Sequence, residues 1–257
     1  MAYRYLFEQM VRRELRQKYK GSALGVVWYL INPLVLMGAY YFMFGVVFKV
    51  AGPAQPDQYP LFLLMGLVVW IFFSQSLLSA APSLLDHGAL VRKARFPRET
   101  IPASVVTVQL VTFVVLLALL APITIAIRGS LDVALLLLPL LLACLFAFVL
   151  GLALAVSVMH AYFRDVAPIL SAALLPWFFM SPIFFEPEAV TSKQTARFVL
   201  EWLNPVAPFI GAVRDVVYGG AAPQTADLVY VVVAATVALF GGHALFRRMQ
   251  GELAVVV

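Results

Sequence analysis

The chain has 257 residues, of which 63% are hydrophobic and only 12% are charged, and its mean hydropathy is +0.95. A soluble domain has about half apolar and a quarter charged residues, so this composition excludes a soluble protein and predicts an all-α integral membrane protein. The formal charge of +5 comes mostly from basic residues that flank apolar segments, which indicates lipid headgroups rather than nucleic acid, and the single cysteine, Cys144, excludes an intramolecular disulfide and a thiolate metal cluster.

The first twenty residues predict an amphipathic helix at the cytoplasmic membrane interface. Apolar residues recur three and four positions apart from Tyr3 to Leu15, and basic residues occupy the other side of the helix. A signal peptide or a plain basic tail is the alternative, but a signal peptide would have a cleavable site of small residues, which is missing here. The six basic residues of this segment are Arg4, Arg12, Arg13, Arg16, Lys18 and Lys20.

Six apolar segments are long enough to cross a membrane, since a span needs about 20 residues. They are Leu30–Val50, Leu61–Ala81, Pro102–Ile127, Val133–His160, Val166–Phe185 and Leu228–Phe246. An even number of spans places both termini on one side of the membrane. Thirteen of the 18 basic residues lie on that side, so the positive-inside rule predicts that both termini are cytoplasmic.

The interiors of these segments contain no Asp, Glu, Lys or Arg. Ion-coupled transporters and membrane-embedded hydrolases carry ionisable groups at depth for proton relay or catalysis, so we expect neither mechanism. An embedded enzyme acting on lipid-linked sugars is a weaker alternative. Its close polar pairs would be Asp86 with His87 and Arg164 with Asp165, and both pairs are better explained as loop caps or ion pairs.

The loop between the second and third spans, Asp86–Glu99, is predicted to contain a short helix that ends before Pro97. Leu90, Val91 and Phe96 can dock on a partner protein while the basic side chains face lipid phosphates or an acidic protein surface. The alternative is a charged flank that does no more than stop membrane insertion.

The segment 186–227, between the fifth and sixth spans, is broken by prolines and cannot form a full span. It predicts two short helices: one with a polar stripe of Lys193, Arg197 and Glu201, and one from Pro208 to Tyr218 that Gly219-Gly220 ends. We expect an outer re-entrant helical hairpin beside a cavity, because a membrane admits such helices only where protein or water covers them. An interfacial lid without a transport role is the alternative.

Aromatic residues concentrate toward the outer halves of the first and fifth spans. Tyr40, Phe44 and Phe48 share one face of the first span, and Trp177 and Phe184 belong to the fifth. Anchoring at the membrane interface is the default interpretation. The second interpretation is that the rings line a passage, because aromatic faces stack on sugar rings.

Residues 13–33 read RELRQKYKGSALGVVWYLINP. This run resembles the N-terminal signature of polysaccharide-export ATP-binding-cassette permeases, which have R-D/E-L-K/R, then R/K-Y, S-x-L-G-x-x-W and a proline. Tyr162–Val166 is similar to the aromatic-R-D-V element of that family, and Asn204-Pro205 is similar to the N-P in its outer hairpin. Six spans and a similar length extend the resemblance over the whole chain.

The resemblance implies a homodimeric, channel-forming permease subunit in a bacterial inner membrane, which moves lipid-linked polysaccharide of the O-antigen (lipopolysaccharide) or teichoic-acid type out of the cytoplasm. Two copies of a separate cytoplasmic ATPase would bind ATP and Mg, because this chain has no G-x-x-x-x-G-K-S/T motif. We therefore expect no cofactor or metal in this chain and no enzymatic activity of its own. The alternative within transport is an ABC permease for drugs or small lipids.

The resemblance also implies roles for particular residues within a single permease domain, 1–257. This domain divides into the interface helix and connection (1–29), spans one to five (30–185), the outer hairpin (186–227), span six (228–246) and a cytoplasmic tail (247–257). Contact with the ATPase is expected at Leu90, Arg92, Lys93, Arg95, Phe96 and Arg98. The translocation path is expected at Tyr40, Phe44, Phe48, Trp177 and Phe184. The pyrophosphate of a polyprenyl carrier, or anionic lipid alone, is expected at Arg12, Arg13, Arg16, Lys18 and Lys20.

Overall fold

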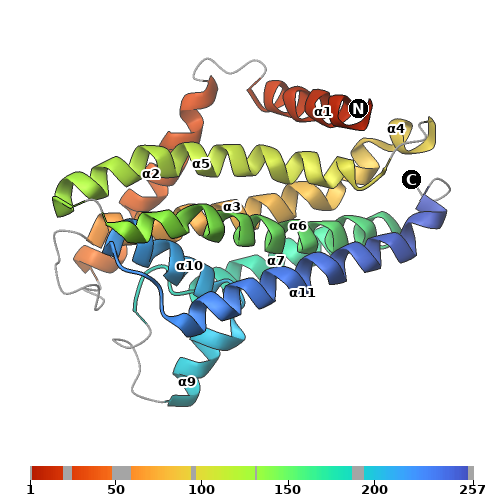
Figure 1. The fold of residues 1–257 in the computed structure, drawn as a ribbon. Helices are drawn as coiled ribbons and strands as arrows, with labels where there is room; N and C mark the ends of the chain where they lie inside the picture. The colour runs from red at the N-terminus through yellow and green to blue at the C-terminus, as the bar shows by residue number, and fades with distance from the viewer. Residues whose placement is uncertain are drawn as a thin grey trace.

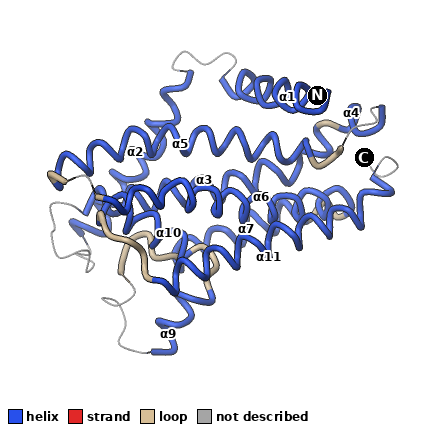
Figure 2. The backbone as a smooth tube through the Cα atoms, in the orientation of Figure 1, coloured by secondary structure: helices blue, strands red, loops and turns tan. Residues whose placement is uncertain are grey.

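The computed structural model of the protein describes residues 2–19, 25–47, 59–93, 97–130, 132–186 and 194–253. Helix is the only regular secondary structure within these ranges, as the tube in Figure 2 shows. The prediction of an all-α fold is therefore confirmed for the part of the chain that the structure describes.

Four described helices are long and apolar enough to cross a membrane, and they match the second, third, fourth and sixth predicted spans. The four run side by side in Figure 1. Helix α3 is central, because its apolar side chains point to all sides: 78% of its most apolar stretch is buried, compared with 17% for α11. The bounds are α3 (Tyr59–Asp86), α5 (Thr100–Arg128), η4 (Val133–Leu137) continuing into α6 (Leu138–Tyr162), and α11 (Thr225–Met249).

The first and fifth predicted spans form shorter apolar helices. After the turn η1 (Gly25–Val27), α2 (Trp28–Tyr40) continues as the π-helix η2 (Tyr41–Val47), and α7 covers Val166–Met180. Helix α7 ends before the expected Phe185, because Pro182 disfavours a helical conformation of the residue before it. Ser181 accordingly has an extended backbone, with φ −89° and ψ 144°.

Helices α6 and α11 pack closely through two glycines. A Cβ atom added to Gly242 would lie 1.9 Å from the carbonyl oxygen of Gly151, and one added to Gly151 would lie 2.1 Å from that of Ala238. Only glycine allows two backbones to approach this closely, which is the role expected for small residues between membrane helices.

The two short helices predicted between the fifth and sixth spans are present. The first is α9 (Gln194–Phe198) with η5 (Val199–Leu203), and the second is α10 (Ala207–Arg214) with η6 (Asp215–Gly219). Gly220 ends η6 with a left-handed φ of 66°, as the glycine pair predicts. Arg197 and Glu201 form an ion pair at 3.1 Å, whereas Lys193 lies outside the described residues. The depth of these helices in a membrane stays a prediction.

At the opposite end of the molecule, α1 (Ala2–Tyr19), α4 (Gly88–Lys93) and η7 (Gln250–Glu252) lie together, and Figure 1 shows the start of α1 and the end of α11 there. Met10, Val91, Ile101 and Phe246 belong to one buried apolar cluster, so α1 packs on the ends of several spans. The larger core surrounds α3. Both ends of the described chain therefore lie at the same end of the molecule, and their side of the membrane stays a prediction.

Candidate functional site

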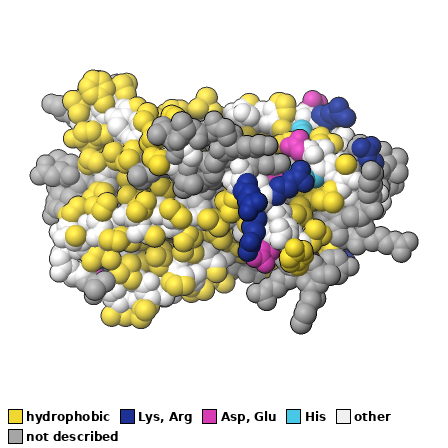
Figure 3. All heavy atoms as spheres, turned by 90° about the horizontal axis from the view of Figure 1, so that it is seen from above, with side chains coloured by type: hydrophobic (Ala, Val, Ile, Leu, Met, Phe, Trp, Pro, Cys, Tyr) yellow, Lys and Arg dark blue, Asp and Glu magenta, His cyan; other side chains and the backbone are white. Residues whose placement is uncertain are grey.

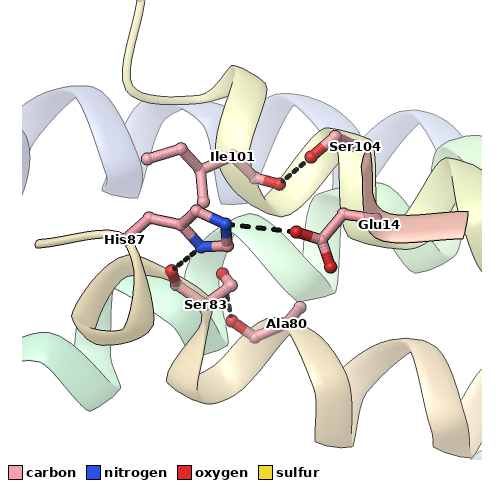
Figure 4. A network of polar contacts seen from close by, with 6 residues as sticks. All are labelled: Glu14, Ala80, Ser83, His87, Ile101 and Ser104. Carbon is pink, nitrogen blue, oxygen red and sulfur yellow. Dashed lines mark hydrogen bonds and ion pairs between the residues drawn. The ribbon is translucent and has the colours of Figure 1, made fainter. Parts of the chain in front are cut away.

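Helix α1 is joined to the turn between α3 and α4 by a polar network (Figure 4). The Nε2 atom of His87 lies 3.1 Å from Oε1 of Glu14, and its Nδ1 lies 2.9 Å from the carbonyl oxygen of Ser83. The imidazole ring of His87 therefore lies between a carboxylate of α1 and a backbone carbonyl oxygen of α3. This contact links the α3–α4 turn directly to α1.

The hydroxyls beside this network stabilise the ends of the neighbouring helices. Ser83 donates to the carbonyl oxygen of Ala80 at 2.6 Å, and Ser104 donates to that of Ile101 at 2.7 Å (Figure 4). Both hydroxyls are buried, and these backbone contacts satisfy them without solvent.

Three of the five basic residues predicted to contact phosphate are exposed on α1. Arg12, Arg13 and Arg16 all face solvent, and in Figure 3 the Lys and Arg side chains gather toward one end of the face while the other end is largely hydrophobic. Arg12 forms an exposed pair with Glu8 at 2.6 Å. Such a pair is worth little to stability, so Arg12 can exchange its partner for a phosphate. Lys18 belongs to α1, and Lys20 lies outside the described residues.

The residues predicted to contact an ATPase surround the same end of the molecule. In α4, Leu90 packs against the apolar cluster under α1 and Arg92 is exposed. Lys93 ends α4, and Arg95 and Phe96 lie outside the described residues.

The end of α11 is held by two side chains, Arg98 from the segment before α5 and Tyr162 from the end of α6. Arg98 donates to the carbonyl oxygen of Gln250, and Tyr162 donates to that of Met249 at 2.5 Å. Glu99 lies 3.4 Å from His243 and 3.3 Å from Arg247 of α11. The loops after the second and fourth spans and the last helix therefore form one connected surface with α1. The sequence did not indicate these contacts, because their partners are far apart along the chain.

The structure brings the predicted path aromatics of the first and fifth spans together. The ring centroids of Phe44 and Phe184 are 4.5 Å apart, and those of Tyr40 and Phe184 are 5.0 Å apart. Phe184 is only 2% exposed, whereas Tyr40, Phe44 and Trp177 are half-buried. The rings therefore join the two spans within one protomer, and their role in a passage stays a prediction. Phe48 lies outside the described residues.

Asn204 connects this aromatic group to the segment that carries α9 and α10. Its Oδ1 accepts hydrogen bonds from Trp177 Nε1 at 2.9 Å and from the backbone N–H of Val206 at 3.1 Å, and its Nδ2 donates to Ser181 Oγ at 2.9 Å. The side chain is only 7% exposed. The Asn204-Pro205 motif drew attention to this position, but the sequence did not reveal its partners.

The fold and these contacts define a class of protein: a multi-pass helical membrane protein with a connected surface at the end that carries both termini. The profile of the family described as ABC-2 type transporter matches residues 5–218. The chain therefore belongs to the ABC-2 type transporter family.

Similar proteins are permeases of polysaccharide export. The O-antigen export system permease protein RfbA of Myxococcus xanthus is 30% identical over 252 residues, which cover 98% of this chain and 95% of the relative. An O-antigen export system permease protein RfbA of Klebsiella pneumoniae is 27% identical over 264 residues, covering 98% and 96%. The polysialic acid transport protein KpsM of Escherichia coli is 27% identical over 249 residues, covering 95% and 93%. The chain is thus an ABC-2 permease homologous to O-antigen and polysialic acid exporters.

Proposed function

We propose that this protein is the channel-forming permease subunit of an ATP-driven exporter, which moves lipid-linked polysaccharide of the O-antigen or teichoic-acid type from the cytoplasm across a bacterial inner membrane. The observation that carries the proposal is similarity over nearly the whole length of permeases named for O-antigen export. The working unit is two copies of this chain with two copies of a cytoplasmic ATPase, which binds the ATP and Mg.

The chain has six spans in this proposal, with α2–η2 and α7 as the short ones. The 15 residues of α7 reach only about 22 Å, which is less than the roughly 30 Å of hydrocarbon in a bilayer. Helices α9 and α10 follow α7 and fill the remaining depth as a re-entrant hairpin, with Asn204 holding them to its end.

Helix α1 lies at the cytoplasmic interface and takes part in coupling. When the ATPase subunits close on ATP, they move the α3–α4 turn through Leu90, Arg92 and their neighbours. The His87–Glu14 contact passes this motion to α1, and the Arg98 and Tyr162 bonds pass it to the end of α11. The path between two copies then opens, and sugar units move outward along the aromatic residues of α2 and α7.

The exposed arginines of α1 hold the pyrophosphate of the polyprenyl carrier near the cytoplasmic leaflet. Guanidinium groups bind phosphate oxygens in pairs of hydrogen bonds, and Arg12, Arg13 and Arg16 are free of the core. A negatively charged membrane surface attracts the same residues, so lipid anchoring and carrier binding use one cluster.

Reconstitution tests the transport role. This chain and its ATPase, purified together in nanodiscs, should hydrolyse ATP faster when a polyprenyl-linked glycan is added, and bare phospholipid or a hydrophobic drug should have no such effect. Stimulation by the drug alone would indicate a drug permease instead. Export by this chain without any ATPase would contradict the proposal.

Replacing Arg12, Arg13 and Arg16 with glutamine should abolish surface polysaccharide in cells while the protein still inserts in the membrane. The physical reason is the loss of three charged donors to phosphate. Surface polysaccharide is measured by blotting whole cells, and insertion by membrane fractionation. Arg248→Gln, which changes an exposed arginine at the same end of the molecule, serves as the control and should export normally. Undiminished polysaccharide in the triple variant would refute the headgroup role.

A further inference from the structure

A cavity of about 450 Å³ lies near the outer hairpin, away from the end that carries α1 and α4. Its volume falls within the roughly 300–1,000 Å³ of typical small-molecule sites. The walls come from α3, the segment after α7, the hairpin helices and the start of α11. The polar and aromatic residues used below are Glu186, Glu201, Trp202, Arg214, Asp215 and Asp227.

One wall is a guanidinium fixed in place by the protein backbone. Arg214 is only 8% exposed, and its Nη1 and Nη2 donate to the carbonyl oxygens of Pro182 at 3.0 Å and Ile183 at 3.2 Å. Its Cζ lies 3.6 Å from the centre of the Phe62 ring. A Cβ atom at Gly66 would lie 2.5 Å from Nη2, so α3 leaves room for this group only because it has glycine there.

The guanidinium retains unused binding capacity. Its Nε is buried without a hydrogen-bond partner, and no carboxylate among the described residues forms an ion pair with Arg214. That Nε is itself shielded from the cavity, but each Nη carries a second N–H group besides the one that meets a backbone carbonyl oxygen, so the guanidinium can still donate at the cavity wall. A guanidinium has only donors, so a ligand at this wall must supply an oxygen acceptor.

The carboxylates at the cavity require a ligand that donates hydrogen bonds, whereas Arg214 requires one that accepts them. Glu186, Asp215 and Asp227 line the cavity together with Glu201, which pairs with Arg197 at 3.1 Å. Carboxylates accept hydrogen bonds, so they favour a ligand that also donates. Four acidic against two basic side chains give the cavity an excess of negative charge, which opposes phosphate, uronic acids and other anions.

The aromatic wall favours a ring-shaped ligand. Trp202 is half-buried, and its indole packs edge-on against Tyr230 with ring centroids 5.7 Å apart. The Tyr230 hydroxyl also donates to the carbonyl oxygen of Trp202 at 3.1 Å, so both the backbone and the ring of Trp202 are held. A fixed indole beside hydrogen-bonding groups of both kinds is suited to a sugar ring, whose hydroxyls donate and accept and whose C–H face is apolar.

We propose that this outer cavity binds a hydroxyl-rich sugar unit without acid groups, with its hydroxyls between Arg214 and the carboxylates and its ring beside Trp202. The inference rests on the proposed function, because an exporter of polysaccharide delivers sugar units to this side of the membrane. None of the aromatic path residues belongs to this site, so it is a separate outer binding site. It would hold the chain after each step and oppose backward sliding.

Binding of a free trisaccharide tests the site. Mannotriose, added to the protein in nanodiscs, should give saturation-transfer NMR signals on its ring protons, and trigalacturonic acid of the same length should not. Asp227→Asn should weaken mannotriose binding about tenfold, since it removes a charged acceptor while keeping the shape of the side chain. Asp132→Asn, which changes a carboxylate outside the cavity, should leave the binding unchanged.

The tryptophan is tested in the same assay. Trp202→Ala should abolish the signals and Trp202→Phe should restore most of them, because phenylalanine keeps an aromatic face. Failure of mannotriose to bind, equal binding by Asp227→Asn, or preferred binding of trigalacturonic acid or a triglucosamine would overturn the proposal. If the protein exports glycolipid with its ATPase but does not bind mannotriose, only the outer site is rejected. If it binds mannotriose but never supports export, only the proposed function is rejected.

Discussion

Asn204 joins three segments through one buried amide: α7 through Trp177, the turn after it through Ser181, and the start of α10 through Val206. Its Oδ1 and Nδ2 are both used, which makes the amide difficult to replace. A polar group in this position costs free energy unless it is paired, so each partner depends on the others.

We expect Asn204→Ala to lower the free energy of unfolding by about 2 kcal/mol, because it leaves the Trp177 indole N–H and the Val206 backbone N–H without their acceptor. Thermal unfolding in detergent measures the change. Asn32→Ala, at an exposed position of α2, is the matched control and should leave the midpoint nearly unchanged. Equal midpoints for the two variants would contradict the role of Asn204.

Asp215 predicts a pH dependence of stability. Burial, and then the charge of Asp227, raise its pKa from 3.8 to about 6, against the opposing effect of Arg214. The folded protein holds this proton more tightly than the unfolded chain, so the stabilising contribution is complete below pH 3.8 and is lost as the pH rises through about 6.

The Asp215→Asn variant removes this titration. Relative to the unmodified protein, its melting midpoint should therefore improve as the pH rises from about 4 to about 7. Thermal unfolding across that range, with Asp132→Asn as the control, checks the sign. A constant difference between the variant and the unmodified protein at every pH would show that Asp215 titrates normally.

At the scale of elements, α6 and α11 contact each other through their backbones, which lie close together, rather than through large side chains packed between them. Gly151 and Gly242 face one another, and the atoms that a methyl group would meet are backbone carbonyl groups, which cannot move aside. Lipid supplies little hydrophobic drive for helix association, so this close packing carries much of the attraction between the two helices.

Gly242→Ala should therefore destabilise the protein by about 1–3 kcal/mol, because the new methyl group forces the helices apart. Gly241→Ala is an unusually close control, since a Cβ at the neighbouring position meets nothing within 4 Å. Thermal unfolding in detergent compares the two. If the two alanine variants have the same midpoint, the close approach does not contribute to stability.

At the scale of the whole molecule, the two ends have different chemistry. One end carries α1 with its exposed arginines, α4 and the end of α11, and α9, α10 and the cavity beside them lie away from that end (Figure 1). This polarity is what the positive-inside rule requires of a protein that places its basic end in the cytoplasm.

Cysteine labelling tests the orientation in a Cys144→Ser background, which removes the only natural thiol. Ser130→Cys, in the exposed turn after α5, should react with a membrane-impermeant maleimide in intact spheroplasts. Arg164→Cys, exposed at the other end, should react only after permeabilisation. The reverse pattern, or labelling of both positions from outside, would contradict cytoplasmic termini.

Much of the architecture follows from local chemistry that is readable along the chain. Apolar length determines the four long helices, Gly220 ends η6 where the backbone must turn left-handed, and the motif around residues 13–33 indicates the family. These features depend on a residue and its near neighbours, so a sequence is sufficient to predict them.

Other features were decided only by tertiary packing. Glu14 contacts His87, which is 73 positions away in the sequence. Phe184 is buried against the Tyr40 ring of α2. Arg214 lies between the Phe62 ring and the backbone of a turn that comes more than thirty residues earlier in the chain. The spacing of residues along one helix does not specify which other helix it will face. Which helices face each other depends on how all the spans pack together. The same packing determines which groups pair with each buried polar side chain.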